Sequence, residues 1–288
     1  MSTDNYFASA INKMISIAVE RDPKSDEDYI GEGGLLYCGK CHTPRQCIHK
    51  WFDGSMKTLP IQCECRKAED LLEAERARKI ERMETIKRLK SSSLMDEKFA
   101  DCTFDNVGIN ADNARQVKIC RRYAEKFREM LLRNQGMLFY GPVGTGKTHL
   151  ACCIGNELMS KLYSVHATSF IKILAQSKSF NGDEENLYIK RMNAADLLII
   201  DDLGAERSTD YALEIVYNVI DSRYRTKKPM IVTTNLSIYD MRNTVDVRYK
   251  RIYDRIFEVC YPVEFTGKSW RTKEAGSRFN EMKELLEG

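Results

Sequence analysis

The stretch Gly141-Pro-Val-Gly-Thr-Gly-Lys-Thr148 decides the fold class of this 288-residue chain. It directly follows the apolar run 136–140 and directly precedes a helical run that starts at His149. Glycines let backbone N–H groups curl around phosphates, the lysine places a positive charge on them, and the threonine hydroxyl ligates Mg²⁺. The following helix directs the positive end of its dipole at the anion. The predicted nucleotide contacts in this stretch are Gly141, Pro142, Val143, Gly144, Thr145, Gly146, Lys147, Thr148 and His149.

Short apolar runs continue beyond this loop and alternate with helical stretches. They occupy residues 137–140, 163–167, 197–200, 230–233 and 259–263. Continuous apolar runs bounded by Gly, Pro or Asp and separated by helices are typical of a buried parallel sheet. The sequence therefore predicts an α/β fold with a central parallel β-sheet flanked by helices.

Polar side chains end two of these runs. Asp201 and Asp202 follow the run 197–200, at the end of a strand where α/β folds bind ligands. We predict that Asp201 holds Mg²⁺ together with Thr148, and that Asp202 polarises an attacking water. Asn235 follows the strand MIVTT and would orient that water. The alternatives are a solvated or helix-capping acid pair and a turn-forming asparagine.

Arginines cluster farther along the chain, in DVRYKRIYDRIFEV. Arg251 and Arg255 are four residues apart and share a helix face. These side chains form either a solvated face or an arginine finger that reaches the γ-phosphate of a neighbouring subunit. Arg271, in KSWR, is a candidate contact to the nucleotide of its own subunit.

The overall composition excludes several classes of protein. The chain has 45 basic and 42 acidic residues, a net charge of +3, and 43% hydrophobic residues, as expected for a globular protein rather than a disordered one. No apolar run approaches the roughly 18 residues that span a bilayer, and the N-terminus has no continuous apolar core typical of a signal peptide. We therefore expect a cytoplasmic protein without a membrane partner.

Half of the ten cysteines fall within 28 positions near the N-terminus. A tight cluster in a chain without an export signal indicates metal binding. We predict a closed structural Zn²⁺ site, with Cys47, His42 and His49 as possible substitutes and a reactive thiol cluster as the alternative. The predicted zinc ligands are Cys38, Cys41, Cys63 and Cys65. The five other cysteines are expected to be small buried hydrophobic residues.

The segments GPVGTGKTHLA, LLIIDDLGAE, IVTTN and RIYDRI occur in this order. Over residues 99–275 they resemble AAA+ ATPases of the DnaC/DnaI type, which load replicative helicases, and the related IstB-type transposition helpers. The resemblance implies a P-loop AAA+ fold that binds ATP or ADP with Mg²⁺. It also implies that ATP hydrolysis depends on assembly of a homo-oligomer.

The same resemblance assigns roles to individual residues. It makes Asn235 the sensor and Arg271 the second sensor. Arg255, rather than Arg251, becomes the arginine finger, because it falls some sixteen positions before the second sensor. Phe104 would lie near the adenine. Thr209 and Tyr211 fall where the family contacts single-stranded DNA, although a buried tyrosine is an alternative.

Three regions follow from these features. We predict a zinc-binding, helicase-interacting domain over residues 1–66, with weak helical character around residues 7–19. A charged helical linker covers residues 67–97, and the AAA+ ATPase domain covers residues 98–288. Between Arg66 and Lys90 there are nine basic and six acidic residues, which suit either a solvated connector or a basic strip for a partner.

The function expected from these regions is ATP-dependent loading of a hexameric replicative DNA helicase, plausibly for a phage or mobile element. Three alternatives stay open at this point. They are a transposition helper of the IstB type, a P-loop small-molecule kinase and a scaffold that does not hydrolyse nucleotide.

Overall fold

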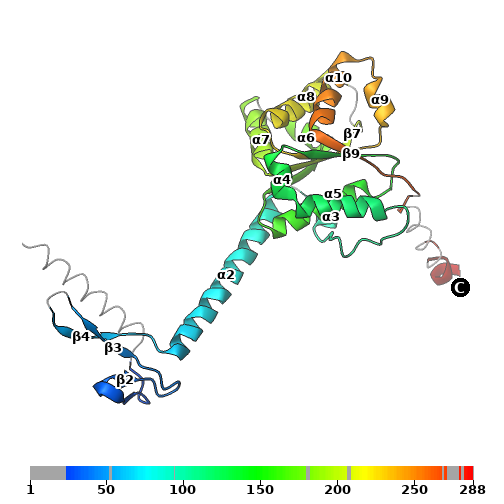
Figure 1. Ribbon diagram of the computed structural model, residues 1–288. Coiled ribbons are helices and arrows are strands. Elements are labelled where there is room, and N and C mark those ends of the chain that lie inside the picture. Colours follow the sequence, from blue (N-terminus) through cyan, green and yellow to red (C-terminus); the bar gives the residue numbers. More distant parts are fainter. Residues whose placement is uncertain are drawn as a thin grey trace, which may run out of the picture. The chain divides into compact units, whose positions relative to one another are not determined.

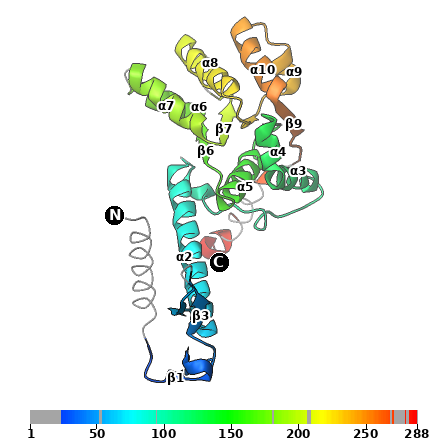
Figure 2. The ribbon, with the colours of Figure 1, turned by 60° about the vertical axis from the view of Figure 1, so that its left-hand side comes forward.

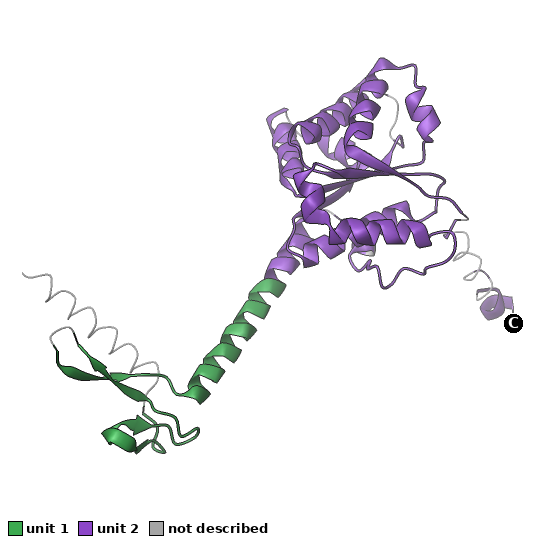
Figure 3. Ribbon diagram, viewed as in Figure 1, with its two compact units in different colours: residues 1–83 green, residues 84–288 purple. Residues whose placement is uncertain are grey.

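The computed structural model describes residues 24–51, 54–93, 95–179, 182–205, 209–267, 269–270, 279 and 282–287. The helical character expected around residues 7–19 lies outside these ranges. The chain divides into two compact units, Met1–Met83 and Glu84–Gly288 (Figure 3). None of the described helices is long and apolar enough to cross a membrane.

The first unit is built from short antiparallel hairpins and the start of a long helix. Its elements are β1 (Tyr29–Ile30), the 3₁₀ helix η1 (Glu32–Gly34), β2 (Leu36–Tyr37), β3 (Gln46–Lys50), β4 (Met56–Pro60) and the first part of α2 (Glu64–Ser92). Strand β1 pairs with β2, and β3 pairs with β4. An ion pair between Asp28 and Arg45 is almost fully buried and ties the start of the unit to the segment before β3.

Helix α2 runs through most of the segment predicted as a charged helical linker and ends in a run of serines. The hydroxyls of Ser91, Ser92 and Ser93 each donate to a carbonyl three residues earlier, so they satisfy acceptors that the end of the helix leaves without an intrahelical partner. The apolar side chains of Ile80 and Met83 are exposed, so they do not form a buried face.

The second unit contains the predicted parallel sheet. Its strands are β5 (Gly136–Tyr140), β6 (Val165–Ser169), β7 (Leu197–Leu203), β8 (Met230–Thr234) and β9 (Cys260–Glu264). They lie in the order β6-β7-β8-β5-β9, and every neighbouring pair is parallel. The five apolar runs of the sequence thus correspond to the five strands.

Helices cover both faces of this sheet (Figures 1 and 2). The remaining elements of the unit are η2 (Glu97–Phe99), α3 (Ala114–Glu125), α4 (Phe127–Leu132), α5 (Lys147–Ser160), α6 (Phe170–Ser177), α7 (Gly182–Ala194), α8 (Asp210–Arg225), α9 (Ile238–Arg242) and α10 (Val247–Val259). Helices α3 and α5 pack on one face, where Ile154 and Cys153 belong to the same core as Phe139. Helices α6, α7, α8 and α10 pack on the other face, around Leu138 and Val232.

The scattered cysteines are buried, as predicted. Cys102, Cys120, Cys152, Cys153 and Cys260 are each at most 7% exposed. Burial raises the pKa of each of these thiols, so they remain neutral and pack as small apolar side chains.

Candidate functional site

The phosphate loop connects β5 to α5 at the carboxyl edge of the sheet. Gly141, Gly144 and Gly146 have φ values of 132°, 80° and 93°, which disfavour any residue with a side chain. At Gly141 the constraint is also steric, because a Cβ atom there would lie 2.1 Å from the carbonyl oxygen of Phe265. The loop is therefore shaped by its glycines, and α5 begins directly at Lys147.

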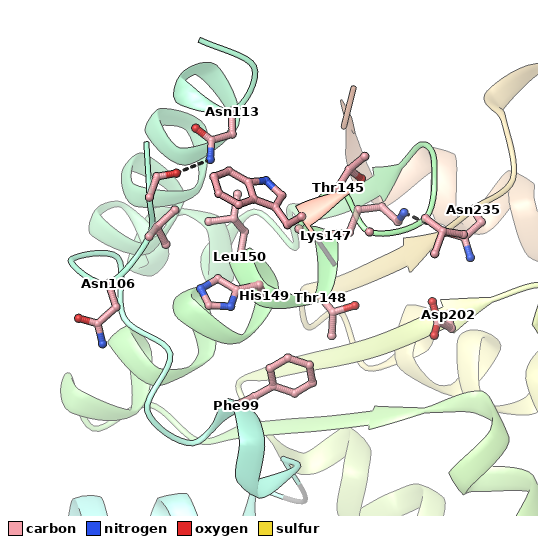
Figure 4. A pocket seen from close by; sticks show the side chains of 16 residues that line it. Phe99, Asn106, Asn113, Thr145, Lys147, Thr148, His149, Leu150, Asp202 and Asn235 are labelled. Atoms are coloured by element: carbon pink, nitrogen blue, oxygen red, sulfur yellow. Dashed lines mark hydrogen bonds between the residues drawn. The ribbon is translucent and has the colours of Figure 1, made fainter. Parts of the chain in front are cut away.

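Lys147 lies at the centre of the site and is only 5% exposed (Figure 4). Its Nζ donates to the carbonyl oxygens of Gly141 and Pro142 at 2.7 Å and to Oδ1 of Asn235 at 2.9 Å. These contacts hold the ammonium group between the phosphate loop and the end of β8. They also bring Asn235, predicted as a sensor, to the lysine.

Two hydroxyls hold the carboxylate of Asp201. Thr148 Oγ1 donates to Asp201 Oδ1 at 2.7 Å, and Thr233 Oγ1 donates to the same oxygen at 2.5 Å. The hydroxyl oxygen of Thr233 also accepts the backbone N–H of Asp202 at 3.0 Å. A carboxylate beside a threonine hydroxyl is the donor set that Mg²⁺ prefers, so Asp201 and Thr148 fit the metal role predicted for them.

Asp202 reaches the site because β7 is irregular at its end. In a regular strand two consecutive side chains point to opposite faces. Here the register between β7 and β8 shifts between Ile200 and Leu203, and Asp202 has a left-handed φ of 57°. This bulge redirects the second carboxylate, so Asp202 lines the same cavity as Lys147 and Asn235 (Figure 4).

The cavity beside the phosphate loop has a volume of about 410 Å³. Its lining residues come from the segment before α3, the phosphate loop, the ends of β7 and β8, and the segment after β9. They are Phe99, Asn106, Val107, Gly108, Asn113, Val143, Gly144, Thr145, Gly146, Lys147, Thr148, His149, Leu150, Asp202, Asn235 and Trp270. A nucleotide requires a pocket of this size with a polar end for its phosphates and an apolar end for its base.

The aromatic residue predicted near the adenine is not part of this lining. Phe104 is 6% exposed and packs in the core with the guanidinium of Arg121 5.3 Å from its ring centre. Phe99 and Val107 line the cavity instead. Phe104 packs in this core together with Cys102 and Val117, away from the cavity.

Arg255 is held within its own subunit. Its guanidinium pairs with Asp221 at 2.6 Å, donates to the hydroxyl of Tyr217 at 3.0 Å, and has 22% of its side chain exposed. Arg251 is exposed and lines a second hollow between α8 and α10. Arg271, the predicted second sensor, lies outside the described residues.

The two residues predicted at single-stranded DNA lie at the start of α8. Thr209 is the N-cap of this helix, and its side-chain oxygen accepts the N–H of Ala212 at 3.2 Å. Tyr211 is 39% exposed, so the alternative of a buried tyrosine does not apply.

Four cysteine side chains of the first unit meet at one point. The Sγ atoms of Cys38, Cys41, Cys63 and Cys65 all lie within 4.8 Å of one another. In a tetrahedral site with Zn–S bonds of about 2.3 Å, the sulfurs would lie about 3.8 Å apart. The arrangement therefore fits a zinc ion, and Cys47, His42 and His49 are outside this group.

The local chemistry of the cluster also fits a cation. A hydrogen bond from Thr43 is the main cause that lowers the pKa of Cys41 to about 5, which favours its thiolate. Hydrogen bonding with Cys63 and Cys38 raises the pKa of Cys65, because crowded sulfurs resist a further negative charge. A bound divalent cation would remove this conflict.

Several residues of the nucleotide site were not predicted from the sequence, among them Thr233 and Trp270. Thr233 is hydrogen-bonded to the carboxylate of Asp201 and to the backbone N–H of Asp202. The only clue to it in the sequence is its position two residues before Asn235, near the end of a strand. Trp270 lines the cavity. The clue to it in the sequence is that it directly precedes Arg271, the predicted second sensor.

The fold and this site define a nucleotide-binding protein of the P-loop class with the AAA+ type of parallel sheet. The family model described as IstB-like ATP binding protein matches residues 64–277, which is more than half of the chain. The chain therefore belongs to the family of IstB-like ATP-binding proteins.

Relatives of this chain include proteins named as replicative helicase loaders. The chain is 32% identical over 177 residues to the replicative helicase loader DnaC of Buchnera aphidicola subsp. Schizaphis graminum, covering 59% of this chain and 69% of the relative. It is 27% identical over 184 residues to the replicative helicase loader DnaC of Escherichia coli K12, covering 62% and 73%. It is 26% identical over 254 residues to the uncharacterized protein YqaM of Bacillus subtilis, covering 84% and 72%.

Solved structures show the same fold. The crystal structure of DnaI has a TM-score of 0.53 and 22% identity, and the match covers 63% of this chain and 98% of that one. The crystal structure of the DnaC helicase loader has a TM-score of 0.51 and 23% identity, and the match covers 59% and 100%. The AAA+ fold implied by the sequence resemblance is thereby confirmed.

Proposed function

We propose that this protein is an ATP-dependent loader of a hexameric replicative DNA helicase. The observation that carries the proposal is the 32% identity to a replicative helicase loader over 177 residues. The site supports it, since Lys147, Thr148 and Asp202 line one cavity and Asp201 accepts a hydrogen bond from Thr148, and these are the groups needed for Mg²⁺-dependent phosphoryl chemistry.

In this proposal each residue of the cavity has a task in ATP hydrolysis. Lys147 binds the β- and γ-phosphates, while Thr148 and Asp201 hold Mg²⁺, which neutralises phosphate charge when bound. Asp202 accepts the proton of the attacking water, and Asn235 orients that water. The short carboxylate of Asp202 acts from the cavity wall to which the bulge in β7 directs it.

Two arginines complete the proposed reaction. Arg255 of one subunit stabilises the γ-phosphate of a neighbouring subunit, and Arg271 contacts the nucleotide of its own subunit. Hydrolysis then depends on assembly of a homo-oligomer, because one subunit alone lacks the arginine finger. The exposed Tyr211, with Thr209, binds single-stranded DNA, where an aromatic ring provides a surface for base stacking.

The N-terminal part is proposed to bind the helicase. We assign this role to residues 1–66, which a structural zinc ion would stabilise, with residues 67–97 as a helical linker and residues 98–288 as the ATPase domain. Support comes from the four converging thiols of this segment, whose chemistry is that of a closed structural site rather than a catalytic one.

A substitution in the phosphate loop tests the nucleotide part of this function. Lys147→Ala should abolish ATP binding and hydrolysis in the full-length protein, because the ammonium group in the loop is removed. Lys161→Ala, at a partly exposed lysine just after the same helix, is the matched control and should leave both unchanged. ATP affinity measured by calorimetry distinguishes the two, and an unchanged affinity in Lys147→Ala would refute the site.

A reconstitution tests the loading part. The full-length protein, a hexameric replicative helicase and circular single-stranded DNA are mixed with ATP, and helicase bound to the circle is measured after gel filtration. We expect deposition that requires this protein and is lost in Lys147→Ala. A protein that hydrolyses ATP but neither binds nor deposits any tested helicase would contradict the loader role.

The second candidate function is a transposition helper. The matching family model carries the name of IstB-like proteins, which supports this alternative on the same fold. Capture of a transposase of an insertion sequence instead of a helicase in the same experiment would favour it. A small-molecule kinase is the weaker alternative, because relatives at 32% and 27% identity are replicative helicase loaders.

A further inference from the structure

The nucleotide cavity has two chemically different ends. One end carries the phosphate loop, with Lys147, Asp202 and Asn235. The other end is built from the apolar or aromatic side chains of Phe99, Val107, Leu150 and Trp270 and from the amides of Asn106 and Asn113. An occupant that matches both ends is anionic on one side and a flat, largely apolar ring with polar edges on the other.

The side chain of Trp270 belongs to the apolar end of the cavity, but its backbone is hydrogen-bonded to the phosphate loop at the polar end. Its backbone N–H donates to the carbonyl oxygen of Gly144, in the phosphate loop, at 2.9 Å. The residue before it packs on the same glycine, since a Cβ atom on Gly144 would lie 2.1 Å from the hydroxyl of Ser269. The position of Trp270 is therefore coupled to the loop that would hold the phosphates.

The indole ring extends from this anchor to the opposite wall. Its Cη2 and Cζ3 atoms lie 3.5 Å and 3.8 Å from the place where a Cβ atom on Gly108 would stand. The backbone of that wall is held in turn by Asn113, whose Nδ2 donates to the carbonyl of Gly108 at 2.8 Å. The ring thus bridges the phosphate loop and the segment before α3.

The burial of this ring differs from that of a core aromatic side chain. Phe139 and Phe265, whose rings pack in the core at a tilt of 47° with centres 4.9 Å apart, are at most 1% exposed. Trp270 is only partly buried, and it lines the cavity. A large aromatic surface kept beside the apolar end of a nucleotide pocket offers a stacking partner to a heterocyclic base.

We propose that Trp270 is a nucleoside-binding residue, whose indole stacks on the base of the bound nucleotide and closes the cavity over it. The proposal rests on the proposed function, since it takes the cavity to bind ATP. The indole carries no positive charge, so its contribution concerns the base and not the phosphates.

The chain is well suited to an optical test, because it contains only two tryptophans. The other, Trp51, lies in the first unit beneath the ammonium of Lys57, 4.6 Å from its ring centre. In a full-length Trp51→Phe protein all tryptophan emission comes from Trp270. We expect ATP with Mg²⁺ to quench this emission by stacking, whereas inorganic tripolyphosphate with Mg²⁺ leaves it nearly unchanged.

Affinity measurements separate the base from the phosphates. By calorimetry, Trp270→Ala in the full-length protein should weaken ATP binding about 5- to 100-fold, as expected for the loss of one base stack. Its affinity for tripolyphosphate should stay within about twofold of the wild type, which also shows that the variant folds. Trp270→Phe should keep most of the ATP affinity.

Three outcomes would overturn this inference. Trp270→Ala that binds ATP as tightly as the wild type would remove the stacking role alone. Equal losses of ATP and tripolyphosphate affinity would make Trp270 a mere support of the phosphate loop. A wild-type protein that binds neither ligand would overturn the proposed function itself, and the stacking role with it.

Discussion

At the scale of single residues, one buried hydroxyl organises the acids of the nucleotide site. Thr233 is fully buried, donates to Asp201 and accepts the N–H of Asp202, so it fixes the direction of the first carboxylate and the backbone of the second. Thr148 reaches the same oxygen of Asp201 from α5. Such a residue touches neither substrate nor metal directly, and we regard it as a positioning residue.

Thr233→Val tests this role with almost no change in side-chain volume. A hydrogen bond to a charged group contributes about 1.5–3 kcal/mol, so the loss should lower ATP turnover about ten- to a hundredfold and raise the Mg²⁺ concentration needed for half-maximal rate. Steady-state turnover across Mg²⁺ concentrations measures both quantities.

The neighbouring threonine provides the matched control for this variant. Thr234 is equally buried, and its hydroxyl donates to the carbonyl of Leu203 rather than to an acid. Thr234→Val should therefore cost comparable stability but leave the Mg²⁺ dependence unchanged. Identical kinetics for the two variants would show that Thr233 serves only the stability of the sheet.

At the scale of elements, the strands and the phosphate loop could be predicted because each has a local cause. Apolar runs bounded by Gly, Pro or Asp must be buried on both faces, and the loop depends on glycines adjacent in sequence. The bulge at Asp202 had no such signal, since two consecutive acids in a regular strand would diverge. The burial of Phe104 could not be predicted from the sequence either, because it depends on packing between segments far apart in the chain.

The cluster of four cysteines indicates how an element could depend on a bound ion. Strands of two to five residues in separate hairpins are marginal by themselves, and the described residues of the first unit include few buried apolar side chains to support them. Cys63 and Cys65 lie at the start of α2. Cys38 and Cys41 come from the loop after β2.

Removal of the metal should therefore unfold this part of the chain. We expect about one Zn²⁺ per chain, whose binding would provide about 10–16 kcal/mol in such a site at neutral pH. A strong chelator should release it and abolish amide protection over residues 31–66, while amides of the parallel sheet stay protected in hydrogen exchange.

Two substitutions make this result specific. Cys38→Ser should lose the ion, because it removes one of the four converging sulfurs. Cys47→Ser should retain it, because that thiol lies on β3 outside the cluster. Loss of protection in both units together after chelation would contradict independent folding of the zinc-binding part.

At the scale of the whole molecule, the sequence indicates roles that a single chain cannot test. In the proposed function, Arg255 would act as an arginine finger on the nucleotide of a second copy of the chain. Within this subunit the guanidinium is occupied by Asp221 and Tyr217. On assembly, Arg255 would have to release the carboxylate of Asp221 and bind a phosphate of the nucleotide in the neighbouring subunit. A guanidinium binds carboxylates and phosphates with similar geometry.

Mixing two inactive variants tests this exchange between subunits. Arg255→Ala should bind ATP normally but lose about a thousandfold or more in hydrolysis, the contribution typical of an arginine finger. Lys147→Ala lacks its own nucleotide but keeps an intact Arg255. Mixed subunits should therefore regain part of the activity, because the second variant supplies its arginine to the nucleotide held by the first.

Arg251→Ala is the control, since Arg251 is an exposed arginine one turn earlier on the same helix and should be nearly neutral. If Arg251→Ala loses hydrolysis and Arg255→Ala does not, the finger is the other arginine. If mixing restores no activity at any ratio, Arg255 serves its own subunit through Asp221, and the loss in its variant reflects packing between α8 and α10. Turnover measured against the mixing ratio decides among these cases, because shared sites give a maximum at an intermediate ratio.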